Sequence, residues 1–417
     1  MSVLHETIYG AAAAPVIVRL LPLLCCLAPM TETQAAVLAA GPGKTYATPC
    51  AAFAAARAGD TVEIEGANTY SGNVCYIAAS NLTIRGVRGR PKIDAAGQNA
   101  QGKAVWVIGG SNVIVDNVEI YGAKVPDHNG AAFRIEGTNF TLRNSFIHDN
   151  ENGILCGANA NSNIVLENND FGHNGDGSGQ THNVYIGAIA SLVFRYNYSH
   201  DAVVGHNLKS RALVNTVVYN RFSTLGPTEQ GTTAAGRPSY EMDLPNGGTA
   251  YVIGNVIQQP AAYENSTLLS YGAEASAGAA DALYVVNNTF INDGANAVFI
   301  NVNSRITKPA HIQNNLFAGR GVLTNQASAT LQTNYKADQV AFVNRAEYDL
   351  HPLTNPQITG AGSEPIVPPT GVALRPVMEY KHTASSSPRP VAVKLDIGAY
   401  QSGSTTVTLL PAGSRKP

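Results

Sequence analysis

The feature that most constrains this chain is an internal repeat. Each copy has a short apolar run, a Gly or polar corner, a second apolar run and then an asparagine. Eight such asparagines recur, at steps of 27, 25, 28, 23, 35, 33 and 27 residues: Asn117, Asn144, Asn169, Asn197, Asn220, Asn255, Asn288 and Asn315. A repeat of this length predicts a solenoid, in which each copy buries its apolar face only by stacking on its neighbours.

The apolar runs have the character of strands. They are short, rich in β-branched and aromatic residues, and bounded by Gly and Asn. Eight pairs of runs follow one another, from 105–108 with 113–115 to 298–300 with 311–312. Because no helical pattern of 10–15 residues separates them, an alternating strand-and-helix fold is excluded. We therefore predict an all-β fold of stacked strands.

The recurring asparagines have a structural interpretation. An asparagine after a strand suits a tight bend that needs a left-handed backbone or a local side-chain hydrogen bond. Stacked from copy to copy, these amides are expected to form an internal ladder. The residues two positions later are expected to form a buried apolar stack: Phe146, Phe171, Phe222, Ile257, Phe290 and Phe317.

Composition excludes some classes of partner. Only 13% of the 417 residues are charged, and the formal net charge is −2. Such a balance provides no general field that would attract nucleic acid or an anionic membrane. Any attraction for an acidic ligand must therefore be local. No sequence signal for a subunit interface stands out, so we expect a monomer.

The N-terminus predicts export. An apolar run at 20–27 is followed by the small-residue stretch Thr33-Gln34-Ala35-Ala36, which has the character of a cleavage site. We predict a signal peptide over residues 1–36 and a periplasmic or secreted protein that keeps no membrane contact after cleavage. In an oxidising compartment Cys50 and Cys75, both in the N-terminal cap, are expected to form a disulfide. Cys156 lies in a predicted strand and is expected to be a small buried residue.

The chain resembles a known architecture at both ends. A predicted helix at 49–58, a Gly-Asp pair and the strand 61–64 resemble the N-terminal cap of right-handed parallel β-helix proteins, the pectate-lyase-like fold. Many of these are polysaccharide lyases and related carbohydrate enzymes. The motif at 396–400 (Asp-Ile-Gly-Ala-Tyr) resembles a closing motif of exported β-helix proteins. The resemblance implies a right-handed parallel β-helix at 37–345 with a capping helix, and a C-terminal wrapping segment and tail at 346–417.

Side-chain alternation predicts a polar column on one face. Alternate residues of a strand point to opposite sides, and stacked strands lie roughly 4.8 Å apart. If the aliphatic residues face inward, then Tyr185, Lys209 and Asp243 face outward on consecutive rungs, and Arg134 lies two rungs before Tyr185. The same parity predicts four further outward residues beside this column: Asn183, Asn207, Arg211 and Glu241. The residues of this face expected to bind substrate are Arg134, Asn183, Asn207, Glu241 and Asp243.

This column has the groups required for chemistry on an acidic sugar. Lytic cleavage of a uronate polysaccharide needs a cation at the carboxylate, a base for the C5 proton and an acid for the leaving oxygen. Arginine binds carboxylates through two parallel hydrogen bonds, and Lys and Tyr can serve as base and acid. We therefore expect Lys209 as base, Tyr185 as acid, and Arg211 or Arg134 as the carboxylate clamp. Glu241 and Asp243 would bind a cation or position Lys209 and Arg211.

A second resemblance concerns the base. Asn207-Leu208-Lys209-Ser210 resembles the Lys-Ser segment of β-helix enzymes of the chondroitinase B and alginate lyase type. In that family the Lys is the catalytic base, which implies this role for Lys209. The family's Arg on the next coil is missing here, where the chain reads Met-Asp-Leu-Pro-Asn at 242–246. Arg211 or Arg134 would have to replace it.

Histidines and aspartates form a second set of candidates. His182 and His206 precede two strands, and they either cap the substrate groove or form hydrogen bonds in the core. Their spacing matches no zinc motif. Calcium is the one cofactor that the sequence leaves open, with ligands from the three aspartates that follow other histidines: Asp149, Asp176 and Asp201.

Three functions remain open from the sequence. The first is an exported polysaccharide lyase acting on a uronate polymer by β-elimination. The second is a glycoside hydrolase, which needs two carboxylates flanking the bond, with Glu241 and Asp243 as the pair. The third is a carbohydrate-binding or envelope scaffold without catalysis, because solenoids offer long grooves suited to chains.

Overall fold

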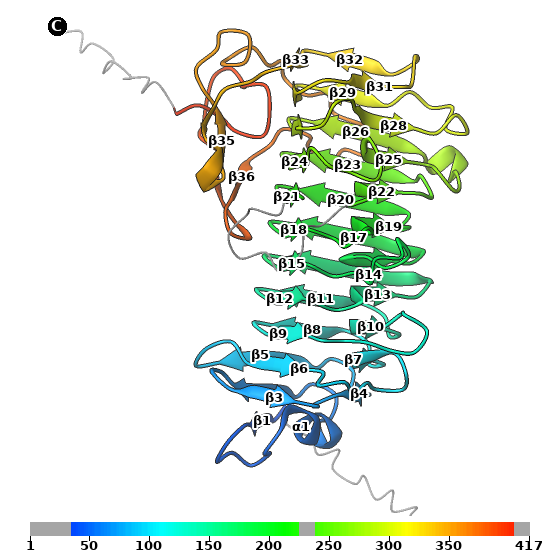
Figure 1. The fold of residues 1–417 in the computed structure, drawn as a ribbon, viewed down its shortest axis with the longest axis vertical. Helices are drawn as coiled ribbons and strands as arrows, with labels where there is room; N and C mark the ends of the chain where they lie inside the picture. The colour runs from blue at the N-terminus through cyan, green and yellow to red at the C-terminus, as the bar shows by residue number, and fades with distance from the viewer. Residues whose placement is uncertain (1–34, 225–237, 404–417) are drawn as a thin grey trace, which may run out of the picture. The chain divides into compact units, whose positions relative to one another are not determined.

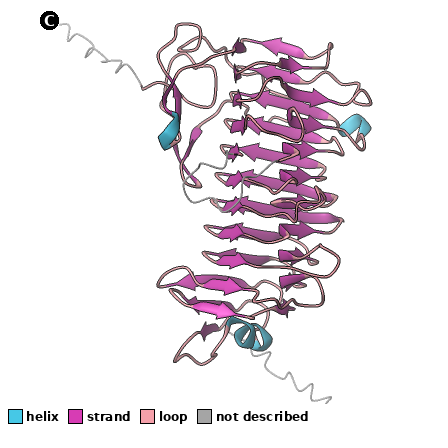
Figure 2. Ribbon diagram, in the orientation of Figure 1, coloured by secondary structure: helices cyan, strands magenta, loops and turns pink. Residues whose placement is uncertain are grey.

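A computed structural model describes residues 35–224 and 238–403. Most of the predicted signal peptide (1–34) and the end of the predicted tail (404–417) lie outside the described residues. The described chain is almost entirely strand and loop, apart from one short α-helix and two 3₁₀ turns, Gly278–Ala280 and Arg345–Glu347 (Figure 2). No helix among these residues has the length and apolarity that a membrane crossing requires.

The strands form three parallel sheets, in which each turn of the chain adds one strand to each sheet (Figure 1). Sheet A consists of β1 (Val37–Ala40), β2 (Thr61–Glu65), β5 (Thr83–Val87), β8 (Val113–Asp116), β11 (Phe140–Arg143), β14 (Asn159–Glu167), β17 (Ile189–Arg195), β20 (Val214–Val218), β23 (Thr249–Ile253), β26 (Ala282–Val286), β29 (His311–Gln313) and β32 (Thr330–Gln332). Sheet B consists of β3 (Thr69–Ser71), β6 (Lys92–Asp94), β9 (Glu119–Tyr121), β12 (Phe146–His148), β15 (Asp170–Gly172), β18 (Tyr198–His200), β21 (Arg221–Ser223), β24 (Val256–Gln259), β27 (Thr289–Asn292), β30 (Leu316–Ala318) and β33 (Tyr335–Ala337). Sheet C consists of β4 (Cys75–Ile77), β7 (Ala104–Ile108), β10 (Ala131–Ile135), β13 (Asn152–Cys156), β16 (Val184–Ile186), β19 (His206–Ser210), β22 (Tyr240–Leu244), β25 (Thr267–Tyr271), β28 (Val298–Val302) and β31 (Val322–Thr324). This is a parallel β-helix, as predicted.

A capping helix closes the N-terminal end of the core. Helix α1 (Pro49–Ala55) begins after Thr48, whose side chain accepts a hydrogen bond from the Ala51 N–H, and it ends three residues before the predicted Ala58. Phe53 packs edge-to-face on the buried Trp106, with ring centroids 5.0 Å apart. Without the helix, the apolar ends of the first strands would face water.

The predicted cysteine arrangement is confirmed. Cys50 of α1 and Cys75 of β4 form a disulfide, which ties the cap to sheet C. Cys156 is a buried free thiol, and burial raises its pKa to about 11. A thiol with a raised pKa is a poor nucleophile, so Cys156 is a packing residue.

The amide ladder exists, with a correction at its start. Asn169 accepts a hydrogen bond from the Ser145 backbone N–H. From Asn197 onward, each buried amide accepts from both the backbone N–H and the side-chain NH₂ of the asparagine one turn earlier. The members are Ser145, Asn169, Asn197, Asn220, Asn255, Asn288, Asn315 and Asn334. Asn117 and Asn144 were predicted as members and are not. They lie one position earlier, at the left-handed corner (φ 58° and 54°).

The predicted apolar stack lies on sheet B, directly after the corner that carries the amide ladder. In register on sheet B lie Ile120, Ile147, Phe171, Ser199, Phe222, Ile257, Phe290 and Phe317. Phe146 was expected in this stack, but the shift of one residue at Asn144 places Ile147 there and leaves Phe146 half-buried. Ser199 interrupts the stack, and its hydroxyl donates to the Asn207 carbonyl at 2.7 Å.

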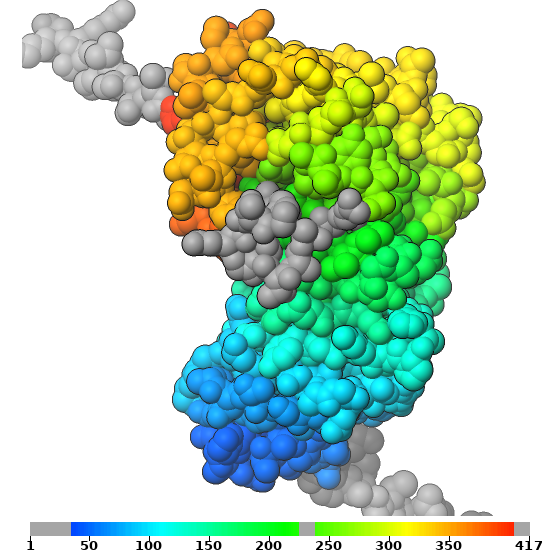
Figure 3. Space-filling view, in the orientation of Figure 1, coloured from blue at the N-terminus to red at the C-terminus, as the bar shows by residue number. Residues whose placement is uncertain are grey.

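The C-terminal segment returns along the solenoid. It forms two antiparallel hairpins, β34 (Phe342–Asn344) with β35 (Asp349–Pro352), and β36 (Met378–Lys381) with β37 (Ser385–Pro388). Three hydrogen bonds attach it to successively earlier turns: Tyr251 Oη to Thr370 Oγ1, Val377 N to Tyr219 Oη and Asn168 Nδ2 to Ala384 O. Figures 1 and 3 show this orange segment beside the green and yellow turns. The 396–400 motif is buried against the later turns of sheet B.

Candidate functional site

The predicted column lies on sheet C, in the predicted register. Tyr185 pairs with Lys209, and Lys209 pairs with Asp243, on three consecutive strands. Arg134 pairs with Leu155, which pairs with Tyr185, so Arg134 is two rungs before Tyr185 as predicted. The alternation of buried aliphatic residues therefore predicted the register of this column correctly, but Asp243, which was predicted to face outward, is buried.

Lys209 and Arg211 hold one carboxylate between them. Lys209 Nζ lies 2.9 Å from Glu274 Oε1, and Arg211 Nη2 lies 2.5 Å from Glu274 Oε2. The Glu274 side chain is 46% exposed, whereas those of Lys209 and Arg211 are 13% and 21% exposed. Partial burial opposes ionisation of Glu274, but the hydrogen bonds from both cations lower its pKa. The pair is thus a cationic site that binds a carboxylate open to solvent.

Arg211 also orders the neighbouring polar groups. Its Nε donates to Tyr185 Oη at 2.9 Å, and its Nη1 donates to Asn246 Oδ1 at 2.8 Å. With Nη2 on Glu274, the guanidinium binds three different partners through its planar fork, which a lysine could not reproduce. Because Tyr185 Oη accepts from Arg211, its own O–H remains available to donate.

Asp243 lies behind Lys209 and is almost fully buried. Its Oδ2 is 3.6 Å from Lys209 Nζ and 3.7 Å from His206 Nε2. Burial raises the pKa of Asp243, and the charge of Lys209 partly offsets this effect. At 2% exposure, Asp243 positions Lys209 from the protein side and offers little surface to a polymer.

Two roles were predicted for His182 and His206, capping the substrate groove or hydrogen bonding in the core. The structure supports the second. The rings stack with centroids 4.6 Å apart, and both residues are buried. His182 Nδ1 accepts from His206 N at 3.0 Å, and His206 Nδ1 accepts from Tyr240 N at 3.3 Å. Burial and the charges of Lys209 and Arg211 lower the pKa of His182 to about 3, and burial beside His182 lowers that of His206. The substrate contact predicted for these neutral rings is not supported, because they lie under the surface.

The outward orientation predicted for Asn183, Asn207 and Glu241 is wrong. All three are at most 1% exposed and belong to a second internal ladder, which lies where the strands of sheet C begin. Asn150, Asn174, Asn183 and Asn207 bind one another in turn through their amides, and Asn207 Nδ2 donates to Glu241 Oε2 at 2.5 Å. Asn183 directly precedes β16, and Asn207 and Glu241 are the second residues of β19 and β22, where the inward–outward alternation of the later strand residues does not hold. These residues therefore cannot bind a polymer, and Glu241 cannot pair with Asp243 as a hydrolase dyad.

Arg134 is remote from the cationic pair. It lies three rungs from Lys209, roughly 14 Å at the usual strand spacing. One sugar carboxylate cannot contact both residues. Of the two clamps that the sequence allowed, Arg211 is the one adjacent to Lys209.

Sequence reasoning missed Glu274 and Asn246. Glu274 lies in the loop after β25, where it is held by hydrogen bonds from Glu274 N and Ala275 N to the Pro245 carbonyl. Asn246 lies in the turn after β22. Neither belongs to a strand, so strand periodicity carried no signal for them. An isolated charged residue in a loop poor in charge was the one available hint.

The aspartates considered for calcium have separate partners. Asp149 pairs with His148 at 2.6 Å, Asp176 accepts from Ser178 and Thr181 within its own loop, and Asp201 pairs with His200 at 2.6 Å.

Among the described residues, the ligand atoms of His173, His200 and Asp201 lie within 4.8 Å of one another. Burial alone would favour a neutral ring, but hydrogen bonds to Asp170 and Asp201 raise the pKa of His200 to about 9. A protonated histidine between two carboxylates offers no lone pair to a metal.

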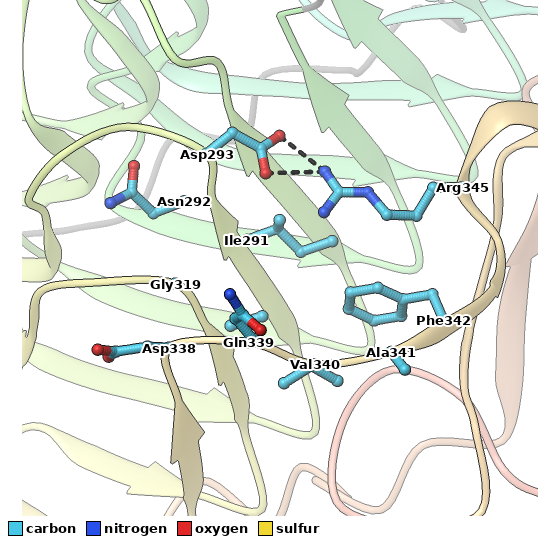
Figure 4. Close-up of a pocket in the computed structure, with 11 residues that line it drawn as sticks. Ile291, Asn292, Asp293, Gly319, Asp338, Gln339, Val340, Ala341, Phe342 and Arg345 are labelled. Atoms are coloured by element: carbon cyan, nitrogen blue, oxygen red, sulfur yellow. Dashed lines mark hydrogen bonds and ion pairs between the residues drawn. The ribbon is translucent and has the colours of Figure 1, made fainter.

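A separate cavity of about 520 Å³ lies between β27, β30 and the segment 338–345. There Arg345 donates two hydrogen bonds of 2.8 Å to Asp293 (Figure 4). None of the residues that line it belongs to the column on sheet C.

Comparisons with known proteins agree with this architecture. The family described as "Right handed beta helix region" matches residues 62–257. The crystal structure of pectate lyase Pel9A superposes with a TM-score of 0.60 at 15% sequence identity, over 89% of this chain and 97% of that chain. No curated protein sequence matches significantly. At such low identity the structural likeness shows the fold alone. With its three parallel sheets, this chain is a right-handed parallel β-helix protein that shares the fold of a pectate lyase.

Proposed function

We propose that this protein is an exported polysaccharide lyase, which cleaves a uronate-containing polymer by β-elimination at Lys209, Arg211 and Tyr185. Support for export comes from the predicted signal peptide and from the disulfide between Cys50 and Cys75. Support for a carbohydrate substrate comes from a fold shared with a pectate lyase.

The observation that carries the proposal is the binding of the Glu274 carboxylate by Lys209 and Arg211. This geometry shows that the pair can bind a carboxylate group. A partly exposed ion pair contributes only about 0–1 kcal/mol, so the carboxylate of a polymer can displace Glu274.

The chemistry assigns one step to each group. Arg211 binds the uronate carboxylate and stabilises the negative charge that develops when C5 loses its proton. Lys209 Nζ takes that proton in its neutral amine form, since an ammonium group has no lone pair to accept it. The electron pair forms the C4–C5 double bond as the C4–O bond breaks, and Tyr185 donates its O–H proton to the leaving oxygen. The products are an unsaturated uronate and a new chain end, so atoms and charge balance without a redox partner.

The test is the ultraviolet absorbance of unsaturated uronate. Purified mature protein is mixed with a panel of uronate polysaccharides, with and without calcium. We expect absorbance to rise on at least one polymer, and we expect Lys209→Ala to lower turnover by about 10²–10⁴-fold.

The matched control is Lys92→Ala, which removes another ion-paired lysine, bound to Glu119 on sheet B. It should leave turnover unchanged. Full activity in a folded Lys209→Ala variant would refute the mechanism. New reducing ends without absorbance would indicate hydrolysis, and saturable binding without product would indicate a scaffold.

A further inference from the structure

A second cavity adjoins the cationic pair. It has a volume of about 350 Å³ and lies at the corner between sheets C and A. Arg211 and Asn246 belong to its lining, and Arg211 is also the residue that binds Glu274. A sugar whose carboxylate binds Arg211 would therefore place a neighbouring substituent at this cavity.

The lining of this cavity is apolar and has small side chains. Six alanines from four turns contribute methyl groups: Ala160, Ala188, Ala190, Ala212, Ala275 and Ala277. Ile189 and Leu213 add apolar surface, and Arg211 is the one charged residue in the lining. A charged or strongly hydrated substituent would lose water here without compensation. The lining suits a small group with an apolar end.

The polar side chains of the lining are those of Arg211, Asn246 and Ser276, and the Ser276 hydroxyl is hydrogen-bonded to Asp281. Asn246 accepts from Arg211 Nη1 at 2.8 Å through its Oδ1, and its amide also carries N–H donors. An acyl group matches this arrangement, because it has one carbonyl acceptor and one methyl group. The carbonyl would face Asn246 and the methyl group would face the alanines.

We infer that this cavity is a subsite for an acetyl group, and that the substrate is an acetylated acidic polysaccharide. The inference rests on the proposed function, because it takes the carboxylate position from Lys209 and Arg211. The acetyl group could be an ester on the uronate or an acetamide on a neighbouring hexosamine, and the experiment separates these two sources.

The test compares matched polymers. One pair is an O-acetylated uronate polysaccharide and the same material after mild alkaline deacetylation. The other is a polymer of uronate and N-acetylhexosamine and its N-deacetylated form. Cleavage is measured with wild-type protein, and binding is measured by calorimetry with the Lys209→Ala variant. Since burying even one methyl group discriminates by about tenfold or more, we expect at least about a tenfold preference for the acetylated member of one pair.

Blocking the cavity provides the second arm. Ala188 is exposed at the cavity, so the phenyl ring of Ala188→Phe is expected to obstruct it and abolish the preference. Ala54→Phe, at an exposed position of α1, is the matched control and should retain the preference.

Each outcome decides one proposal. Cleavage without preference in either pair overturns the acetyl subsite and leaves the lyase proposal standing. Tighter binding of an acetylated polymer that no assay shows to be cleaved supports the subsite and overturns the lyase. A preference that survives in Ala188→Phe places acetyl recognition elsewhere and overturns the subsite.

Discussion

Glu241 places a carboxyl group where the repeat otherwise places amides. It ends a row of buried amides, and its neighbour in that row, Asn207, donates to it. Burial raises the pKa of Glu241 to about 8, despite the hydrogen bond from Asn207. A carboxyl group buried beside an amide is stable when protonated and costly when ionised. Glu241 is therefore a structural acid rather than a catalytic one.

This leads to a prediction on stability and pH. The folded pKa lies above the ordinary value of 4.5, so the stability linked to Glu241 is present below about pH 4.5 and is lost as the pH rises toward 8. Glu241→Gln cannot ionise. It should stabilise the protein relative to wild type by a few kcal/mol at pH 8 and by much less at pH 5. Urea unfolding at both pH values tests this, and an equal difference at both would contradict it.

Arg211 supports a second prediction at the residue scale. It binds Tyr185, Asn246 and Glu274 through separate nitrogens. Arg211→Lys keeps the positive charge but loses the planar guanidinium group, whose separate nitrogens bind the three partners. We therefore expect kcat/KM for the uronate polymer to fall by about 10–100-fold. The comparison is Arg195→Lys, because Arg195 pairs with Glu167 on sheet A. A similar loss in both variants would show that the fork of Arg211 has no special role.

At the scale of elements, the corners of the solenoid carry a continuous row of buried amides. Asn255 shows the bonding of one ladder member. It donates to the Val217 carbonyl and to Asn288, and it accepts from Asn220. Each turn thereby satisfies the corner backbone of the turn before it, which a buried corner requires.

Removing one asparagine of the ladder should therefore lower the free energy of unfolding by more than the loss of that side chain's own hydrogen bonds. Asn255→Ala leaves buried groups of Asn220 and Val217 without partners, and we expect a loss of about 2–4 kcal/mol in unfolding free energy. Asn163→Ala removes an exposed asparagine of sheet A and should cost less than about 0.5 kcal/mol. Chemical denaturation compares the two, and equal costs would contradict a structural role for the ladder.

At the scale of the whole molecule, stability depends on closing the ends of the stack. The disulfide between Cys50 and Cys75 spans 25 residues and holds α1 against sheet C. A link of this length stabilises by about 3 kcal/mol in the chain-entropy account. A protein built this way is suited to an oxidising compartment.

The corresponding prediction concerns reduction. The double variant Cys50→Ser and Cys75→Ser should unfold at a lower temperature than wild type under oxidising conditions. A reductant should lower the wild-type Tm toward that of the variant and should leave the variant unchanged. An effect of reductant on the variant would instead point to Cys156, the remaining thiol of the described chain.

Sequence by itself determined the parts that repeat. The period of the apolar runs specified a solenoid, and alternation within strands specified the register of Tyr185, Lys209 and Asp243, because both depend on local geometry. The strands of sheet B escaped prediction, since most of them have only three residues, and the early ones bury only the middle residue.

Only the tertiary structure decided what happens between strands. The first residues of a strand can turn a side chain inward, as they do for Asn207 and Glu241, and a loop can bring a residue such as Glu274 to Lys209 from two turns away. These positions depend on contacts between distant parts of the chain. No local period encodes them, so the second ladder that ends at Glu241, the carboxylate at the cationic pair and the cavity beside Arg211 emerge only when the turns are stacked.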